Sequence, residues 1–302
     1  MLNYNNSIIE EIQLFGRNIY LKRDDLLHDD FSGNKARKFA YILEDKFGEF
    51  DNISHIISHG SNQSNAMYSL SVLAKLKDWK YTYYTNHLSD TLKDNLQGNL
   101  KYALENDMDL IVGDYDKTII SKVDNHTLFV PEGGYFKYAE FGIQKLANEI
   151  VDWQKKKKIS NLKVFLPSGT GTTALYLQKY LVDYEDIVDI EVITTPCVGD
   201  SNYLQKEFIE LERLEIYPTI IPPKRKYHFG KLYPHLFELW QTTKANTNIE
   251  FDLLYDPIGL ETLDTYLNDN QDIQILYIHQ GGLIGNETMI KRYNHKLIKS
   301  AQ

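Results

Sequence analysis

Short apolar runs alternate with amphipathic stretches along most of the chain. Runs such as 53–58 and 162–166 have the length of buried strands, and 64–77 and 138–157 have the period of helices. We expect further strands at 81–85, 109–112, 128–131, 190–194 and 273–278, and further helices at 93–105, 173–182, 202–214 and 233–246. Strands and helices that alternate over short connections predict an α/β fold, with mainly parallel sheets covered by helices on both faces.

The length of 302 residues suggests two domains, at roughly 150 residues per domain. No linker rich in Gly, Ser or Pro separates two halves of the sequence. If there are two domains, the chain therefore crosses between them more than once.

The formal charge of −9 comes from 33 Lys and Arg against 42 Asp and Glu. This balance argues against nucleic acid or an anionic membrane as a partner, but it allows a small anionic ligand held by backbone amides and local lysines. The single cysteine, Cys197, excludes an internal disulfide framework and a cysteine-clustered metal site. With no secretory signal and no run of about 18 apolar residues, we expect a soluble cytoplasmic protein.

Histidines His55, His59, His228 and His279 do not follow a metal-binding pattern such as HExxH. We expect no metal site, and we interpret these histidines as structural or supporting residues.

Ligands of open parallel sheets bind beyond the carboxyl ends of the strands. Four polar segments that contain glycine occupy such places, at 59–65, 131–134, 167–173 and 279–286. In the third, PSGTGTT, Gly169 and Gly171 allow close approach of the backbone, and the start of the next helix offers N–H groups to an anion. An ordinary turn capped by Ser and Thr accounts for the same residues equally well. The segment matches neither the P-loop nor the G-x-G-x-x-G pattern.

The segment 21–43 places Lys35, Arg37 and Lys38 directly after Gly33-Asn34. In a helix, Lys35 and Lys38 share a face, so one could act as a nucleophilic amine while the other pairs with an anion. A solvated basic helix start is the simpler interpretation of this window alone. Basic residues at a helix N-terminus oppose the helix dipole, however, which points to a functional position.

Together these segments resemble a known family. They occur in the order found in pyridoxal-phosphate enzymes grouped as 1-aminocyclopropane-1-carboxylate deaminase and D-cysteine desulfhydrase. The matching segments are KRDDL…SGNKARK, QSN at 63–65, VPEGGY at 130–135, SGTGTT at 168–173, YHFGK at 227–231 and YIHQGGLIGN at 277–286. The resemblance implies the tryptophan-synthase-β-like fold, also called fold type II. It implies a small domain at 46–140 inserted into a larger one made of 1–45 and 141–302, with the cofactor in the cleft, and a homodimer.

The resemblance also implies roles for individual residues. Lys35 would bind the aldehyde of pyridoxal 5'-phosphate covalently, and Asn65 would bond to the ring hydroxyl of the cofactor. The phosphate would be held by Lys38, Gly169, Thr170, Gly171, Thr172 and Thr173. Ser64 would be catalytic together with Lys35, and the amino-acid substrate would contact Gln63, Ser64, Asn65, Glu132, Phe229 and Gln280. Helix capping is the alternative role of Ser64 and Asn65.

Several positions depart from the family pattern. Gly259 and Leu260 stand where relatives have a tyrosine and the group that contacts the pyridine nitrogen; Glu261 or Thr262 could take over after a local shift, or Asp256-Pro257 could be only a turn. Ala66, Phe229 and Gln280 also differ from the residues that relatives often have.

The loss of hydroxyl groups disfavours the opening of a cyclopropane ring. We therefore expect a lyase or deaminase for a small amino acid, with β-elimination from a D-cysteine-like substrate as the leading example. The alternatives are 1-aminocyclopropane-1-carboxylate deamination, a cofactor-binding protein with little activity, and a phosphate-binding or phosphosugar-binding protein that uses only the 168–173 loop.

Overall fold

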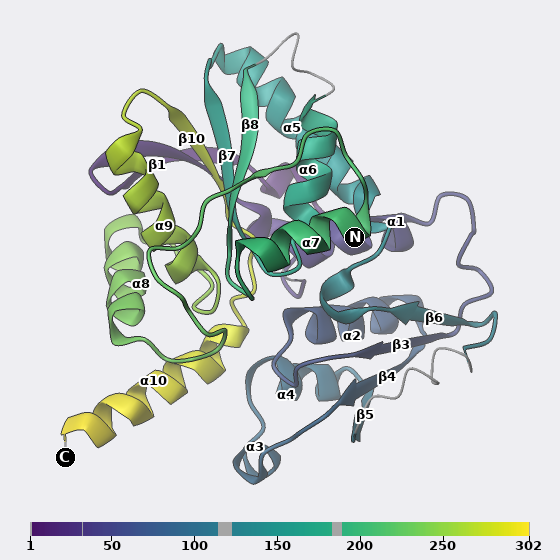
Figure 1. Ribbon diagram of the computed structural model, residues 1–302. Coiled ribbons are helices and arrows are strands. Elements are labelled where there is room, and N and C mark those ends of the chain that lie inside the picture. The colour runs from purple at the N-terminus through teal and green to yellow at the C-terminus, as the bar shows by residue number, and fades with distance from the viewer. Residues whose placement is uncertain (1, 32, 114–122, 183–188, 302) are drawn as a thin grey trace.

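The computed structural model describes residues 2–31, 33–113, 123–182 and 189–301, and it contains two β-sheets (Figure 1). Listed across the first sheet, its six strands are β1 (Ile9–Leu14), β2 (Arg17–Lys22), β10 (Gln274–Ile278), β7 (Leu162–Ser168), β8 (Ile190–Pro196) and β9 (Thr219–Ile220). Across the second sheet, the four strands are β5 (Met108–Val112), β4 (Lys80–Thr85), β3 (His55–His59) and β6 (Thr127–Val130).

The described helices connect and cover these sheets. They are α1 (Gly33–Glu44), α2 (Asn65–Lys77), α3 (Asp90–Asp94), α4 (Gly98–Glu105), α5 (Ala139–Lys157), α6 (Thr172–Val182), α7 (Ser201–Leu211), α8 (Pro234–Thr247), α9 (Asp256–Asp269) and α10 (Gly285–Ala301). Short 3-10 turns are η1 (Tyr4–Asn6), η2 (Asp24–Leu26) and η4 (Glu132–Gly134). None of the described helices combines the length and the apolar character needed to cross a membrane.

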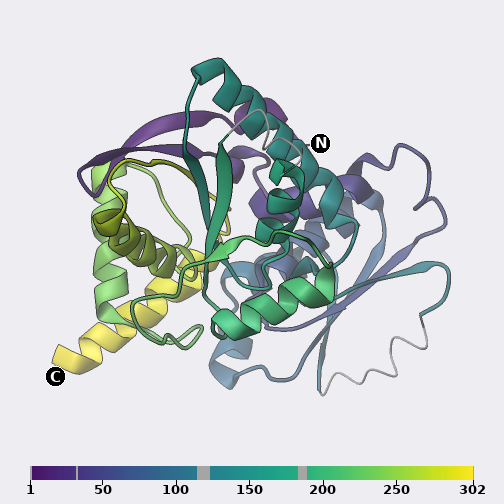
Figure 2. The same ribbon diagram turned by 45° about the horizontal axis from the view of Figure 1, so that its top comes forward.

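The six-stranded sheet is parallel except for β1, which pairs with β2 in an antiparallel hairpin. Alternate residues of its strands enter different cores, because side chains along a strand point to opposite faces. Val164 and Leu166 pack on the side of α5 and α6, whereas Phe165 packs on the side of α8 and α9. Figures 1 and 2 show these two pairs of helices on opposite sides of the sheet.

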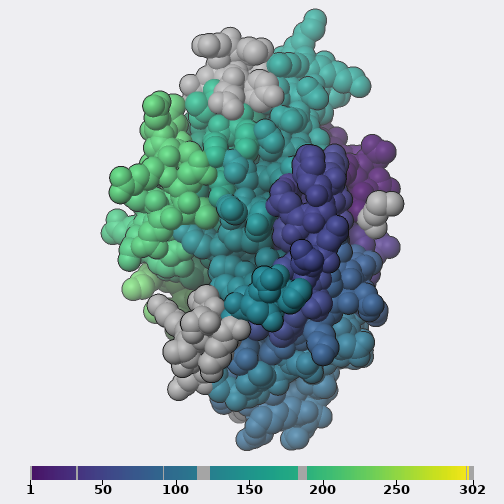
Figure 3. All heavy atoms as spheres, turned by 90° about the vertical axis from the view of Figure 1, so that its right-hand side faces the viewer, coloured from purple at the N-terminus to yellow at the C-terminus, as the bar shows by residue number. Residues whose placement is uncertain are grey.

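The four-stranded sheet is entirely parallel. Its core joins residues of α1, α2 and α4 to strand residues such as Ile56 and Tyr81. In the space-filling view of Figure 3, this part of the chain (blue) forms the lower portion of the molecule, below α5 (teal). Helix α1 packs against both α2 and α5, so it lies where the two parts of the molecule meet.

The predicted fold class is confirmed: the protein is α/β, with two mainly parallel sheets and helices that follow the strands. The stretch expected as one helix at 93–105 is instead two helices, α3 and α4, and Gly98 starts the second with a positive φ of +55°. The sequence analysis did not anticipate the β1–β2 hairpin, α9 or α10. The strands of the smaller sheet all fall between residues 55 and 130, and the domain boundaries at 46 and 140 stay a prediction.

A buried ionic network fixes α1 on the larger part of the molecule. The Arg37 guanidinium is fully buried and donates to both carboxylate oxygens of Asp24, at 3.0 and 2.7 Å, and to both of Glu149 on α5, at 2.7 and 2.8 Å. Lys22 on β2 pairs with the same Glu149 at 2.7 Å. At Gly142 of α5, a Cβ atom would lie only 2.0 Å from the Arg37 carbonyl oxygen, so glycine allows the two helices to approach this closely.

Replacing Arg37 by Met should destabilise the protein by about 3–5 kcal/mol, because it leaves the buried Asp24 carboxylate without its partner. The free energy of unfolding in urea measures this loss. Lys93→Met, which breaks an exposed 2.9 Å pair with Asp90, should change stability by no more than about 1 kcal/mol. Equal losses in the two variants would contradict the anchoring role of Arg37.

Candidate active site

The first turn of α1 is fitted closely against two neighbouring segments. A Cβ atom at Gly33 would lie 2.4 Å from the Asp24 carbonyl oxygen, so only glycine fits at this helix start. The Asn34 N–H donates to the Gln280 carbonyl at 2.9 Å, and the Asn34 side-chain amide donates to the Gln280 side chain at 3.2 Å. Gln280 in turn donates to the Pro167 carbonyl at 2.7 Å. Gln280 thus joins α1 to the end of β7.

Lys35 and Lys38 are both buried, with 8% and 3% of their surface exposed. The Lys35 amine donates to Asn34 Oδ1 at 3.2 Å, and the Lys38 amine donates to the Gly133 carbonyl at 3.0 Å. No ion pair to Lys38 forms within the described part of the chain. The solvated basic helix start considered above is therefore wrong.

Burial changes the acidity of both amines. It lowers the pKa of Lys35 to about 8, and the Asp252 carboxylate partly opposes this shift. Burial also lowers the pKa of Lys38 well below its ordinary value, and the nearby Lys35 charge lowers it further. A lysine that is partly neutral near physiological pH is a good nucleophile, and a second buried amine without a carboxylate suits an anionic ligand.

The loop between β7 and α6 lies next to Lys38. Thr172 and Thr173 are buried at the start of α6, and the hydroxyls of Thr170 and Thr172 are 3.1 Å apart. A Cβ atom at Gly133, whose carbonyl binds Lys38, would touch the Thr170 methyl group at 3.3 Å. The Lys38 amine, η4 and the start of α6 therefore lie next to one another.

Two glycines shape this loop. Gly171 has a φ of +74°, and a Cβ atom there would lie 2.4 Å from the Phe208 ring. A Cβ atom at Gly169 would lie 3.3 Å from the Tyr255 ring, so the loop backbone runs along that aromatic side chain. Close packing on one side and N–H groups at the helix start on the other are typical of a phosphate-binding loop.

The segment 63–65 begins α2. Ser64 Oγ accepts hydrogen bonds from the N–H groups of Ala66 and Met67 at 3.1 and 3.3 Å, which is the geometry of a helix cap. Asn65 accepts from the Asn99 amide at 2.7 Å and donates to Asp252 Oδ2 at 3.5 Å. The Gln63 side chain is turned toward α10, where Thr288 donates to its oxygen at 2.9 Å, and its nitrogen is buried without a partner among the described residues.

The remaining predicted substrate residues lie around the same region. Glu132 is exposed at the start of η4, and a Cβ atom at Gly60 would meet its carboxylate at 2.6 Å. Phe229 is 41% exposed, and its ring centroid lies 5.1 Å from that of Tyr255.

The segment with the altered family pattern forms the first turns of α9. Asp256 and Pro257 begin this helix, so the suggestion that they form only a turn is wrong. Leu260 is buried in the apolar core, Glu261 accepts from the Tyr227 hydroxyl at 2.5 Å, and the Thr262 hydroxyl donates to the Ile258 carbonyl at 2.8 Å. All three side chains are thus occupied by structural contacts.

The sequence analysis missed two residues that the fold brings to the lysines. The Tyr255 ring borders Gly169, and the buried Asp252 carboxylate interacts with both Lys35 and Asn65. The signal for Asp252 was an acidic residue just before a helix start, but its partners are more than 180 positions away along the chain.

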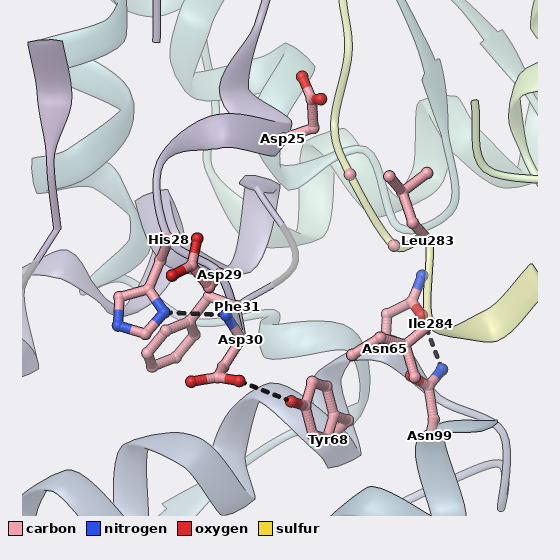
Figure 4. A pocket seen from close by; sticks show the side chains of 12 residues that line it. Asp25, His28, Asp29, Asp30, Phe31, Asn65, Tyr68, Asn99, Leu283 and Ile284 are labelled. Atoms are coloured by element: carbon pink, nitrogen blue, oxygen red, sulfur yellow. Dashed lines mark hydrogen bonds between the residues drawn. The ribbon is translucent and has the colours of Figure 1, made fainter. Parts of the chain in front are cut away.

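A small, partly open cavity of about 70 Å³ lies beside Asn65 and the glycine loop after β10 (Figure 4). Its outer wall carries Asp29, Asp30 and Tyr68, and the Tyr68 hydroxyl donates to Asp30 at 3.5 Å. Asn65 and Asn99 line the same cavity.

No protein-family model matches the chain. Two curated proteins do, and both are named putative 1-aminocyclopropane-1-carboxylate deaminase. The one from Pyrococcus horikoshii is 24% identical over 94% of this chain and 89% of its own length. The one from Thermotoga maritima is 22% identical over 90% of each chain. The chain is thus similar, at low identity and over most of its length, to two proteins that carry this name.

The chain is also similar to solved structures. A structure described as an ACC deaminase homologue matches with a TM-score of 0.75 at 19% identity, over 93% of this chain and 90% of its own. A hydrogen sulfide-producing enzyme from Fusobacterium nucleatum matches with a TM-score of 0.63 at 14% identity, over 91% and 95%. A pyridoxal 5'-phosphate-dependent aspartate racemase matches with a TM-score of 0.63 at 12% identity, over 92% and 90%. The fold is therefore that of the fold type II pyridoxal-phosphate enzymes.

Replacing Lys38 by Met should raise the melting temperature of the cofactor-free protein by at least about 2 °C, because an amine without an ionic partner no longer has to be buried. The folded pKa lies below the unfolded one, so the destabilisation by Lys38 is complete below the folded pKa and fades as the pH rises toward the unfolded value. The difference between variant and wild type should therefore narrow from pH 7 to pH 10. Lys46→Met, at an exposed lysine, is the control, and a K38M protein less stable than this control would contradict the prediction.

Proposed function

We propose that the protein is a pyridoxal-phosphate-dependent lyase or deaminase that acts on a small amino acid. The observation that carries the proposal is the pair of buried amines on one face of α1, beside the loop before α6. When bound, pyridoxal phosphate supplies an aldehyde that reacts with an amine and a ring that stabilises a carbanion at the substrate Cα.

The residues present fit this cofactor. Lys38 has no carboxylate partner among the described residues. Because a buried ammonium group is stabilised by an adjacent anion, a phosphate group would be a suitable partner for it. The N–H groups at the start of α6 and the hydroxyls of Thr170, Thr172 and Thr173 are donors suited to the same phosphate. Gly169 and Gly171 keep side chains out of this space.

Lys35 is the residue for covalent attachment and for proton transfer. Its lowered pKa leaves part of the amine neutral near physiological pH, which suits attack on an aldehyde and later removal of a proton from the substrate Cα. Its burial excludes bulk water from these steps.

Residues 63–65 are proposed to receive the substrate and the ring hydroxyl. Asn99 fixes the Asn65 side chain, which leaves the Asn65 amide nitrogen to donate to a neighbouring oxygen. Gln63 and Ser64 are proposed to bind the substrate carboxylate with nearby N–H groups. Glu132, Phe229 and Gln280 complete the proposed substrate contacts.

The leading reaction is β-elimination from a D-cysteine-like substrate, which gives a keto acid, ammonia and sulfide. Two observations support it: Phe229 lacks a hydroxyl, and a structural neighbour is described as a hydrogen sulfide-producing enzyme. Deamination of 1-aminocyclopropane-1-carboxylate is the second candidate, favoured by the names of the curated relatives. The burial of Leu260 motivates a third, a cofactor-binding protein with little activity. We also propose a cytoplasmic homodimer, on the family resemblance alone.

Borohydride reduction of the protein with bound pyridoxal phosphate, followed by peptide mass mapping, tests the attachment site. We expect a pyridoxyl group on Lys35 and none on Lys38. Lys35→Ala should abolish the label, and Lys38→Ala should weaken cofactor binding while Lys35 can still be labelled at high cofactor concentration. A label on another lysine, or no label at all, would overturn the proposal.

A substrate panel tests the reaction. The wild-type protein should form keto acid from D-cysteine and β-chloro-D-alanine, and should turn over 1-aminocyclopropane-1-carboxylate about 100-fold more slowly or worse, because a missing donor at a reacting centre costs on this order. Phe229→Tyr should raise the rate with the cyclopropane substrate relative to D-cysteine. Preferred turnover of 1-aminocyclopropane-1-carboxylate by the wild type would reverse the order of the first two candidates, and no turnover of any amino acid would favour the third.

A further inference from the structure

The segment between α8 and α9 holds one carboxylate next to the candidate site. Asp252 is 4% exposed. Its Oδ1 atom accepts the N–H groups of Leu254 and Tyr255, both at 2.7 Å, and so forms the turn that leads into α9. Its Oδ2 atom takes no part in that turn and lies 3.5 Å from the Asn65 amide nitrogen. Oδ1 thus stabilises the turn, and Oδ2 contacts Asn65 of the candidate site.

The backbone around Asp252 is held from several sides. His279 bonds to the Glu250 carbonyl at 2.7 Å, while its other ring nitrogen accepts from the Gly281 N–H at 3.2 Å. Asn286 accepts from the Leu253 N–H at 2.7 Å and donates to the Phe251 carbonyl at 2.9 Å. Side chains from the β10–α10 region therefore fix the backbone on both sides of residue 252.

Glycine makes room for the contact between Asp252 and Asn65. Gly282 has a φ of +92°, and a Cβ atom there would lie 2.5 Å from the Asn65 amide nitrogen and 2.7 Å from Asp252 Oδ2. Any side chain at this position would separate the two groups. The HQGG segment therefore has two effects. His279 holds the backbone just before Asp252, and Gly282 leaves space for the contact between Asp252 and Asn65.

The segment 260–262 offers no free side chain to the site. Leu260, Glu261 and Thr262 are all engaged in structural contacts, as described above. Asp252 is instead a buried carboxylate that interacts with Lys35 and touches Asn65, the two residues assigned to the cofactor.

We propose that Asp252 is a positioning residue of this site, which orients the Asn65 amide and acts electrostatically on the buried Lys35 amine. The inference rests on the proposed function for the identity of the cofactor, whereas the effect of Asp252 on Lys35 can be measured in the cofactor-free protein. The other titratable groups near this carboxylate are Asp256, Cys197, Tyr255 and Tyr277.

The test uses Asp252→Asn, which keeps an oxygen for the N–H groups of Leu254 and Tyr255 and removes only the charge. In the cofactor-free, full-length protein, the rate at which trinitrobenzenesulfonate modifies Lys35 is followed against pH by peptide mass spectrometry. The wild-type midpoint is expected near pH 8. Since an anion favours the protonated amine, D252N should shift the midpoint down by about one pH unit.

Asp256→Asn is the matched control. Asp256 is also buried and lies four positions away, but its carboxylate accepts from the Tyr277 hydroxyl at 2.7 Å and from the Asp252 N–H at 2.8 Å. Its effect on the Lys35 midpoint should be clearly smaller. With pyridoxal phosphate added, D252N should bind the cofactor about 10-fold more weakly, while borohydride still places the pyridoxyl group on Lys35.

An unchanged Lys35 midpoint in a D252N protein with wild-type circular dichroism would overturn the inference, as would equal shifts in D252N and D256N. Failure of the proposed function looks different: Lys35 would not carry the pyridoxyl group in any variant, whatever its labelling profile. If D252N does not fold, Asp252→Glu decides the matter, because it keeps the charge and should keep a midpoint within about half a unit of the wild type.

Discussion

The candidate site depends on a helix that is held by an ionic network on one side so that it can present two unpaired amines on the other. Arg37 binds Asp24 and Glu149 with all its side-chain nitrogens, while Lys35 and Lys38 face the region between the two sheets. Burying two amines destabilises a protein that has no ligand to pair with them. The rigid attachment of α1 keeps them buried, because rotation of the helix toward solvent would break the Arg37 network.

A second constraint comes from the loop after β10, which connects nearly every part of the site. Gln280 links the start of α1 to the end of β7, His279 holds the segment before α9, and Gly282 lets Asn65 approach Asp252. The loop therefore helps to set the positions of the start of α1, of Asn65 and of the segment that carries Asp252. We therefore expect few substitutions in this loop to be tolerated, even though most of its contacts stabilise the fold and do not involve a ligand.

The sequence predicted those features that depend on local spacing. Lys35 and Lys38 share a helix face because they are three residues apart, and the glycine loop precedes a helix because a short apolar run ends at Leu166. What escaped prediction depends on distant partners. Gln63 turns toward Thr288, and Asp252 meets Asn65 across 187 positions; neither contact leaves a periodic signal. The β1–β2 hairpin was missed because its turn is Phe15-Gly16, with both residues at positive φ, and a phenylalanine is not a usual turn signal.

The departures at 259–262 leave an acidic side chain, Asp252, in contact with Asn65 from the turn just before the same helix. In an α/β protein of this kind the functional groups stand at the ends of strands and helices, where several segments converge within a few ångströms. Leu260 contributes to the core behind the site, and the turn just before the same helix brings Asp252 to Lys35. An acidic group can therefore move from one segment to its neighbour without altering the fold, provided that the backbone receiving it is fixed. The hydrogen bonds of His279 and Asn286 fix that backbone here. For this reason the altered motif does not by itself argue for a loss of activity.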